Sequence, residues 1–95
     1  MGLRFTWDGE KADANRRKPD VSFEEALTVF GDPLARIHDG PYHSVRERRE
    51  IIVGHSTKVR PPVVDFTERR GVIRLISARR ATRHEREGYE EGTRP

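Results

Sequence analysis

The stretch PVVDFTERRGVIRLISARRATRHE, residues 62–85, predicts two strands followed by a helix. Its two apolar segments, residues 62–68 and 72–78, are rich in the β-branched and aromatic side chains that favour strands. The RRG sequence between them suits a three-residue loop in which Gly71 takes the left-handed third position. We therefore expect an antiparallel hairpin at this point of the chain.

The helix after the hairpin has a recognisable start. Thr82 and Glu85 have the spacing of a capping box, so we expect a helix that runs to about Tyr89. Residues 91–95, EGTRP, then form a frayed tail. Arginines gather where the second strand ends and this helix begins, and their rigid, multidentate donors suit phosphate.

Shorter elements precede the hairpin. Residues 3–7 alternate apolar and polar side chains like a half-buried strand, and Asp8 can cap a helix over residues 9–17. A second helix begins at the capping box of Ser22 and Glu25, and it stops at Gly31 and Pro33. Its apolar stripe comprises Phe23, Ala26, Leu27 and Phe30.

Two further strands are expected at residues 34–38 and 49–56. The predicted order is one strand, two helices, three or four mostly antiparallel strands and a terminal helix. This order predicts an α+β domain with a small antiparallel sheet and its helices packed on one face.

Size and composition bound the possible classes of protein. The 95 residues, 1–95, are enough for a single domain, but only 33% are hydrophobic and 37% are charged. The core must therefore be thin, and we expect a partner to cover part of the apolar surface. The chain has no cysteine and no apolar run near the ~18 residues that a membrane span requires. We expect a soluble cytoplasmic protein.

The charge is uneven along the chain. Residues 1–40 contain 6 basic and 8 acidic side chains, whereas residues 41–95 contain 13 basic and 8 acidic side chains. Sixteen of the 19 basic residues are arginine, which favours planar, bidentate contact with phosphate or carboxylate. The natural partner is a nucleic acid or an acidic protein.

The hairpin carries the candidate chemistry. The four histidines lack metal-ligand spacing, and no Gly-rich phosphate loop, G-x-S-x-G elbow or cysteine nucleophile is present, so we expect no metal and no cofactor. Glu68 and Arg69 lie where one strand enters the turn, and Arg79 and Arg80 lie where the other strand leaves. Arg74 lies between two apolar strand residues, so it projects from the opposite face. The alternative is that Glu68 is only a turn carboxylate paired with an arginine.

The order of motifs resembles the BrnT family of toxins. The similarity rests on WDGEK, VSFEEA, IIVG, and TER followed by ISARRAT, and it covers about residues 5–91. It implies a RelE-like fold and a metal-independent endoribonuclease that cleaves RNA and inhibits translation. It also implies neutralisation by a BrnA antitoxin with a ribbon-helix-helix domain that binds operator DNA, in a 2:2 complex.

The resemblance also assigns roles to residues. By matched position it places Glu68, Arg69, Arg79 and Lys18 in catalysis, with Glu68 as the candidate general base. The phosphate-binding candidates are Arg74, Arg80 and Arg83. Cleavage would proceed by attack of the ribose 2′-hydroxyl on the adjacent phosphate, and fixed cations would stabilise the charge that develops in the transition state.

This chain departs from the family pattern at three places. It reads Lys18-Pro19-Asp20 where the family commonly has Lys-His-Gly, so a histidine that could transfer a proton is absent. Pro61 and Pro62 should shorten their strand or move it to an edge. Asp65 takes a usually apolar position and could neutralise a nearby arginine. Two alternatives therefore remain open: a non-catalytic nucleic-acid-binding module, and an interaction module such as a degenerate toxin.

Overall fold

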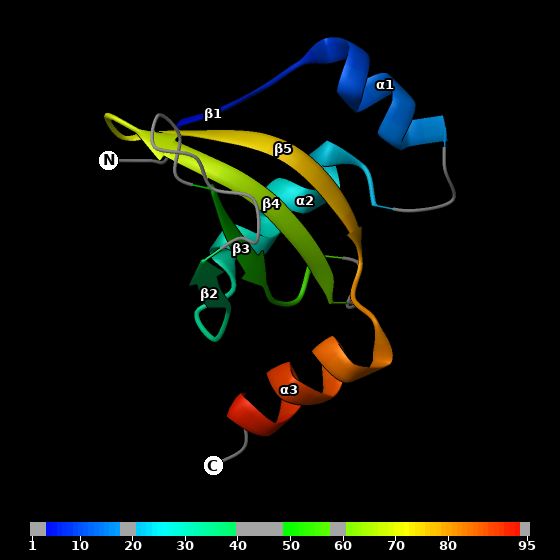
Figure 1. Cartoon of the computed structure of the whole chain (residues 1–95), viewed down its shortest axis with the longest axis vertical. Coiled ribbons are helices and arrows are strands. Elements are labelled where there is room, and N and C mark those ends of the chain that lie inside the picture. Colours follow the sequence, from blue (N-terminus) through cyan, green and yellow to red (C-terminus); the bar gives the residue numbers. More distant parts are fainter. Residues whose placement is uncertain (1–3, 18–20, 40–48, 58–60, 94–95) are drawn as a thin grey trace.

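The computed structural model describes residues 4–17, 21–39, 49–57 and 61–93 (Figure 1). The elements in chain order are β1 Arg4–Trp7, α1 Gly9–Arg17, α2 Phe23–Thr28, the 3₁₀ helix η1 Val29–Gly31, β2 Arg36–Asp39, β3 Arg49–Val53, β4 Pro62–Arg69, β5 Val72–Arg80 and α3 Arg83–Thr93. The α+β prediction is confirmed, and each expected element is present. None of these helices is long and apolar enough to cross a membrane.

The five strands form one mixed sheet in the order β1-β5-β4-β3-β2. β2, β3, β4 and β5 are antiparallel to their neighbours, but β1 pairs in parallel with β5, with Arg4 opposite Val72 and Trp7 opposite Leu75. The prediction of an antiparallel sheet is therefore wrong at this edge. The alternation in residues 3–7 indicates a buried face, but it contains no information on strand direction.

The β4–β5 hairpin has a tighter turn than expected. Arg69 pairs directly with Val72, so only Arg70 and Gly71 lie in the turn. Both residues have positive φ angles, 53° at Arg70 and 80° at Gly71. The left-handed conformation of Gly71 is confirmed, whereas the three-residue loop is wrong. Two residues with positive φ match the right-handed twist of the flanking strands.

The prolines before β4 do not move this strand to an edge. β4 is central in the sheet, and Pro62 is its first residue, fully buried opposite Arg80. The missing proline N–H is tolerated at the start of a strand, where the hydrogen-bond ladder begins. The prediction of a shortened or peripheral strand is therefore wrong.

The two N-terminal helices cover one face of the sheet. Asp8 caps α1, since its Oδ1 accepts a hydrogen bond of 2.8 Å from the Glu10 N–H, and Ser22 Oγ caps α2 through the Glu25 N–H at 3.1 Å. Trp7 packs edge-to-face on Phe23, with ring centroids 6.0 Å apart, as expected of a core anchor. The core between helices and sheet comprises Ala12, Val21, Phe23, Ala26, Val29, Ile52, Val64, Phe66, Ile73, Leu75 and Ala78.

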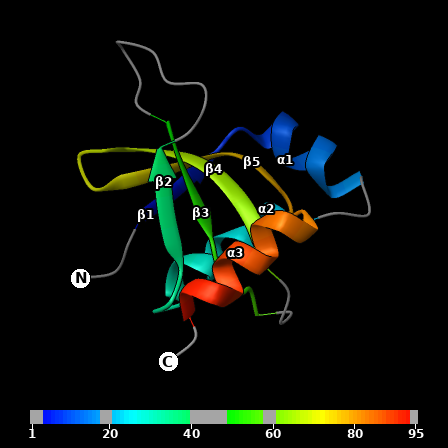
Figure 2. The same ribbon diagram turned by 60° about the horizontal axis from the view of Figure 1, so that its bottom comes forward.

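Helix α3 lies on the opposite face, at one end of the sheet (Figure 2). Its Tyr89 packs against Val53 and Val63, which neighbour the core residues Ile52 and Val64 in sequence and point the other way. The prediction that all the helices pack on one face of the sheet is therefore wrong. The helix also continues to Thr93, past the expected end near Tyr89, so residues 91–93 belong to α3 and not to a frayed tail.

Candidate nucleic-acid interface

The face of the sheet opposite the N-terminal helices carries arginines on its strands. On β5, Ile73 and Leu75 are buried in the core, and Arg74 between them is exposed on the other side, as predicted. Arg74 pairs with Thr67, so Arg69, two residues further along β4, projects from the same face. Arg69 and Arg74 make no ion pair with any residue that the structure describes.

A β-bulge brings Arg79 to this face. Strict alternation would place residues 74 and 79 on opposite sides, because they are five apart. The register shifts by one residue at Ile76, so that Leu75 pairs with Phe66 and Ser77 pairs with Asp65. Arg79 then pairs with Val63, whose side chain contacts Tyr89 on the α3 side. The bulge therefore unites arginines that the sequence pattern alone would separate.

The register extends the same face across the sheet. Arg4 pairs with Val72, Arg49 pairs with Thr67, and Arg36 pairs with Val53. We call this surface the arginine face; of the described strand residues it includes Arg4, Arg36, Arg49, Arg69, Arg74 and Arg79. Several fixed cations on one side of a sheet suit a polyanion such as a nucleic acid.

One carboxylate, Asp65, lies within the arginine face on β4. It pairs with Ile51 on one side and Ser77 on the other, and it is partly buried. Burial raises the pKa of Asp65 above its usual value, against the opposing effects of Arg49, Arg79 and the Ser77 hydroxyl. Its Oδ1 is buried and has no hydrogen-bond partner in the described part of the chain.

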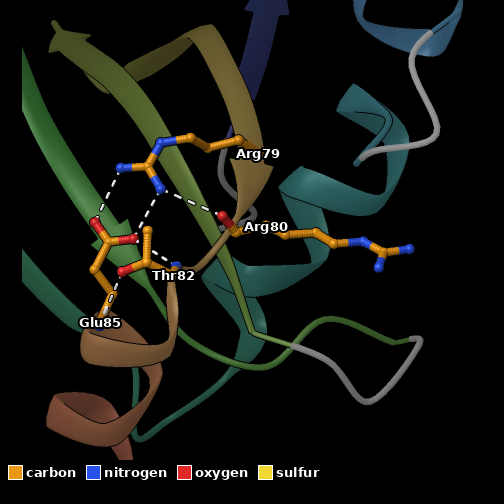
Figure 3. A network of polar contacts seen from close by, with 4 residues as sticks. All are labelled: Arg79, Arg80, Thr82 and Glu85. Atoms are coloured by element: carbon orange, nitrogen blue, oxygen red, sulfur yellow. Dashed lines mark hydrogen bonds and ion pairs between the residues drawn. The ribbon is translucent and has the colours of Figure 1, made fainter.

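Arg79 is held by an acid at the start of α3 (Figure 3). Its two terminal nitrogens donate to the two carboxylate oxygens of Glu85, at 2.7 and 2.9 Å. Glu85 Oε1 also accepts from the Thr82 N–H at 2.8 Å, and Thr82 Oγ1 accepts from the Glu85 N–H at 3.2 Å. The predicted capping box is confirmed, and its carboxylate also binds Arg79.

The ion pair shifts both partners in favour of their charged forms. The hydrogen bond from Arg79 is the largest cause that lowers the pKa of Glu85, to about 2, despite the opposing effect of burial. The same hydrogen bond raises the pKa of Arg79. Arg79 nevertheless retains 49% side-chain exposure, so part of it remains accessible to a ligand.

The remaining predicted site residues lie apart from these arginines. Glu68 pairs with the core residue Ile73, so it projects from the face opposite Arg69 and Arg74. The Glu68 side chain is exposed, because it lies near the hairpin end of β4. Arg80 pairs with the buried Pro62, and Figure 3 shows its side chain pointing away from that of Arg79. Arg83 lies on α3 and donates to Glu87 at 3.0 Å. Lys18 is outside the described residues.

Sequence reasoning missed other members of the arginine face. Arg4, Arg36 and Arg49 lie on three different strands, and only the pairing of those strands places them on one side. The separation of Glu68 from Arg69 was available from the sequence, because consecutive strand residues point to opposite faces. No group of three or more potential metal ligands is found among the described residues.

A hydrogen-bonded cluster attaches the end of α3 to the body of the protein. Tyr89 Oη donates to Asp32 Oδ2 at 2.7 Å and lies 3.1 Å from the ring nitrogen Nδ1 of His55. The backbone N–H of His55 donates to the same Asp32 oxygen at 2.8 Å. Since the tyrosine proton is used for Asp32, His55 Nδ1 carries the proton and donates to Tyr89. Burial and the Asp32 carboxylate raise the pKa of Tyr89 to about 12.

A small α+β fold with an arginine-lined sheet face defines a basic protein suited to an anionic ligand. The family model described as "Ribonuclease toxin, BrnT, of type II toxin-antitoxin system" matches residues 7–85, from the end of β1 to the capping box of α3. The chain therefore belongs to the BrnT family of ribonuclease toxins. A search of curated proteins gives no significant match.

Proposed function

We propose that this protein is a metal-independent endoribonuclease that cleaves RNA and thereby inhibits translation. The family is one of ribonuclease toxins, and the fold places Arg69, Arg74 and Arg79 on one accessible face. That common face is the observation that carries the proposal. Cations fixed on a sheet can bind the phosphate and stabilise the charge that develops as the 2′-hydroxyl attacks.

The three arginines act in different ways. Arg69 and Arg74 are exposed and bind the RNA backbone without first breaking an ion pair with a described residue. Arg79 must exchange the carboxylate of Glu85 for a phosphate oxygen, which costs free energy and predicts slow cleavage. Lys18 remains a predicted contributor to phosphate binding.

A cleavage assay with metal removed tests the reaction class. Purified protein is incubated with single-stranded RNA, alone and on ribosomes, in excess EDTA. The expected products end in a 2′,3′-cyclic phosphate or a 3′-phosphate, because the attacking group is the neighbouring 2′-hydroxyl. Cleavage that is abolished by EDTA and restored by magnesium would contradict the metal-independent reaction.

The family also implies an antitoxin partner. We propose that this partner is a BrnA antitoxin, which binds operator DNA through a ribbon-helix-helix domain and forms a 2:2 complex with the toxin in the cytoplasm. An acidic antitoxin segment would complement the arginine face and exclude RNA from it. We also propose that the α+β fold is of the RelE-like type.

The Arg79–Glu85 pair favours a second candidate function. If the pair does not open, RNA binds to the remaining arginines without reacting, and the protein is a nucleic-acid-binding module. RNA binding without cleavage, with or without metal, would support this alternative.

A further inference from the structure

We propose that Asp65 is the group that accepts the proton of the ribose 2′-hydroxyl during cleavage. This inference rests on the ribonuclease activity proposed above. The resemblance to the family assigns no catalytic role to Asp65. The geometry of the arginine face points to it.

The position of Asp65 in the sheet is the first argument. Asp65 and Thr67 are two residues apart on β4, and Arg74 pairs with Thr67, so Asp65 shares the face of Arg74. Glu68, the base predicted by resemblance, projects from the other face. A base must reach the same nucleotide whose phosphate the arginines bind. Of these two carboxylates, only Asp65 lies on the correct side.

The surroundings of Asp65 are the second argument. Arg49 on β3 and Arg79 on β5 are the cations that act on its carboxylate, the Ser77 hydroxyl is its hydrogen-bond donor, and Glu85 of α3 neutralises part of the charge of Arg79. In the register of the sheet, Arg49 pairs with Thr67, two residues from Asp65 on β4, and Arg79 pairs with Val63, two residues from Asp65 on its other side, so the two arginines flank it on this face. An RNA bound by them would therefore bring its ribose to the same part of the face.

The unused oxygen of Asp65 is the third argument. Oδ1 is buried without a hydrogen-bond partner in the described part of the chain, and a buried acceptor without a donor costs free energy. A ribose hydroxyl would satisfy it. Because the atom is shielded, neighbouring side chains must rearrange to admit the hydroxyl. Burial also raises the pKa of Asp65, which makes the carboxylate a stronger base.

The proton balance of this step is simple. Asp65 takes the proton of the 2′-hydroxyl as the 2′ oxygen forms its bond to phosphorus. The bond from phosphorus to the 5′ oxygen breaks, and that oxygen takes a proton from water. Asp65 then returns its proton to solvent. The products are a 2′,3′-cyclic phosphate and a 5′-hydroxyl, and no oxidant or reductant is needed.

The test compares Asp65→Asn with the wild type under single-turnover conditions on single-stranded RNA in EDTA. Asparagine keeps the shape but cannot accept the proton, so we expect cleavage to fall by about 100-fold or more. RNA affinity should be unchanged or higher, because a negative charge leaves the arginine face. The melting temperature should not fall, because the variant removes a buried charge. Asp13→Asn, an exposed Asp on α1, is the charge-matched control and should cleave like the wild type.

The pH profile separates a base from a structural residue. Wild-type cleavage should decline as the pH falls through the pKa of Asp65, because the base must be ionised, and the residual activity of Asp65→Asn should lack this decline. Asp65→Asn activity within threefold of the wild type, or loss of Glu68→Gln activity instead, would overturn the inference and leave the ribonuclease intact. Loss of RNA binding or of the fold in Asp65→Asn would also overturn it. A wild type that does not cleave would overturn the proposed function itself, and this inference with it.

Discussion

Replacing Glu85 by glutamine isolates the charge that joins α3 to the sheet. Glutamine keeps an oxygen that can accept from the Thr82 N–H, so the capping box remains, but the ion pair with Arg79 is lost. The pKa of Glu85 is lowered from 4.5 to about 2, which corresponds to about 3 kcal/mol for a fully shielded pair. Because Arg79 is half exposed, solvent screens the pair, and we expect a loss of about 1 kcal/mol.

Denaturation as a function of pH measures this loss. Since the pKa of Glu85 is lowered by folding, its stabilisation is present above pH 4.5 and is lost as the pH falls from 4.5 toward 2. At pH 7 the variant should melt about 4–8 °C below the wild type, and the two should converge in acid. At neutral pH the variant should also bind RNA more tightly, because Arg79 no longer needs to leave a carboxylate.

Glu87→Gln is the matched control. Glu87 also pairs with an arginine on α3, Arg83, but both partners are largely exposed, so its loss should change stability by less than about 0.5 kcal/mol. Equal stability of Glu85→Gln and the wild type at pH 7 would show that the Arg79–Glu85 pair does not hold α3 to the sheet.

Two further substitutions test the backbone. Arg70→Asn should raise the free energy of unfolding by up to about 1 kcal/mol in urea denaturation, because asparagine tolerates the φ of 53° better than arginine does; an unchanged or lower value would contradict this. Gly54→Ala should lower it by about 1–3 kcal/mol, because the added Cβ would lie 2.8 Å from Ala35 Cβ and 2.9 Å from Asp32 Oδ2. Wild-type stability of Gly54→Ala would show that this close approach relaxes freely.

Local signals in the sequence predicted the elements well. The caps at Asp8, Ser22 and Thr82 were found because each involves residues two to three positions apart. The hairpin and the left-handed Gly71 were found for the same reason. The turn length was wrong because Arg70 adopts a positive φ, which its residue type does not suggest.

Features that depend on distant pairing could not be predicted. The parallel direction of β1 and the position of α3 on the second face follow from packing between segments far apart in the chain. The arginine face required the register of all five strands and the bulge at Ile76, which no local pattern marks. The sequence predicts that Asp65 could neutralise a nearby arginine, but its position beside Arg49 and Arg79 depends on the same register.

Partner charges decided which arginines remain available. The apolar neighbours of Arg74 correctly predict its exposed side, whereas no local pattern predicts the pairing of Arg79 with Glu85. The sequence predicts the capping box, but the Glu85 carboxylate reaches Arg79, six residues earlier, only because β5 leads directly into α3. Strand position therefore predicted the side of the sheet for Arg74, but it predicted neither the side nor the partner of Arg79.

The most direct test of the arginine face compares Arg74→Ala with Arg86→Ala in the EDTA cleavage assay. Both variants lose one positive charge, but Arg74 lies within the arginine face. Arg86 lies on α3, with its Nε 3.9 Å from Glu90 Oε1. If the arginine face binds the reacting phosphate, Arg74→Ala should lower the single-turnover rate or the RNA affinity at least tenfold, and Arg86→Ala should change neither. Equal cleavage and RNA affinity in the two variants would show that the ribonuclease site lies elsewhere.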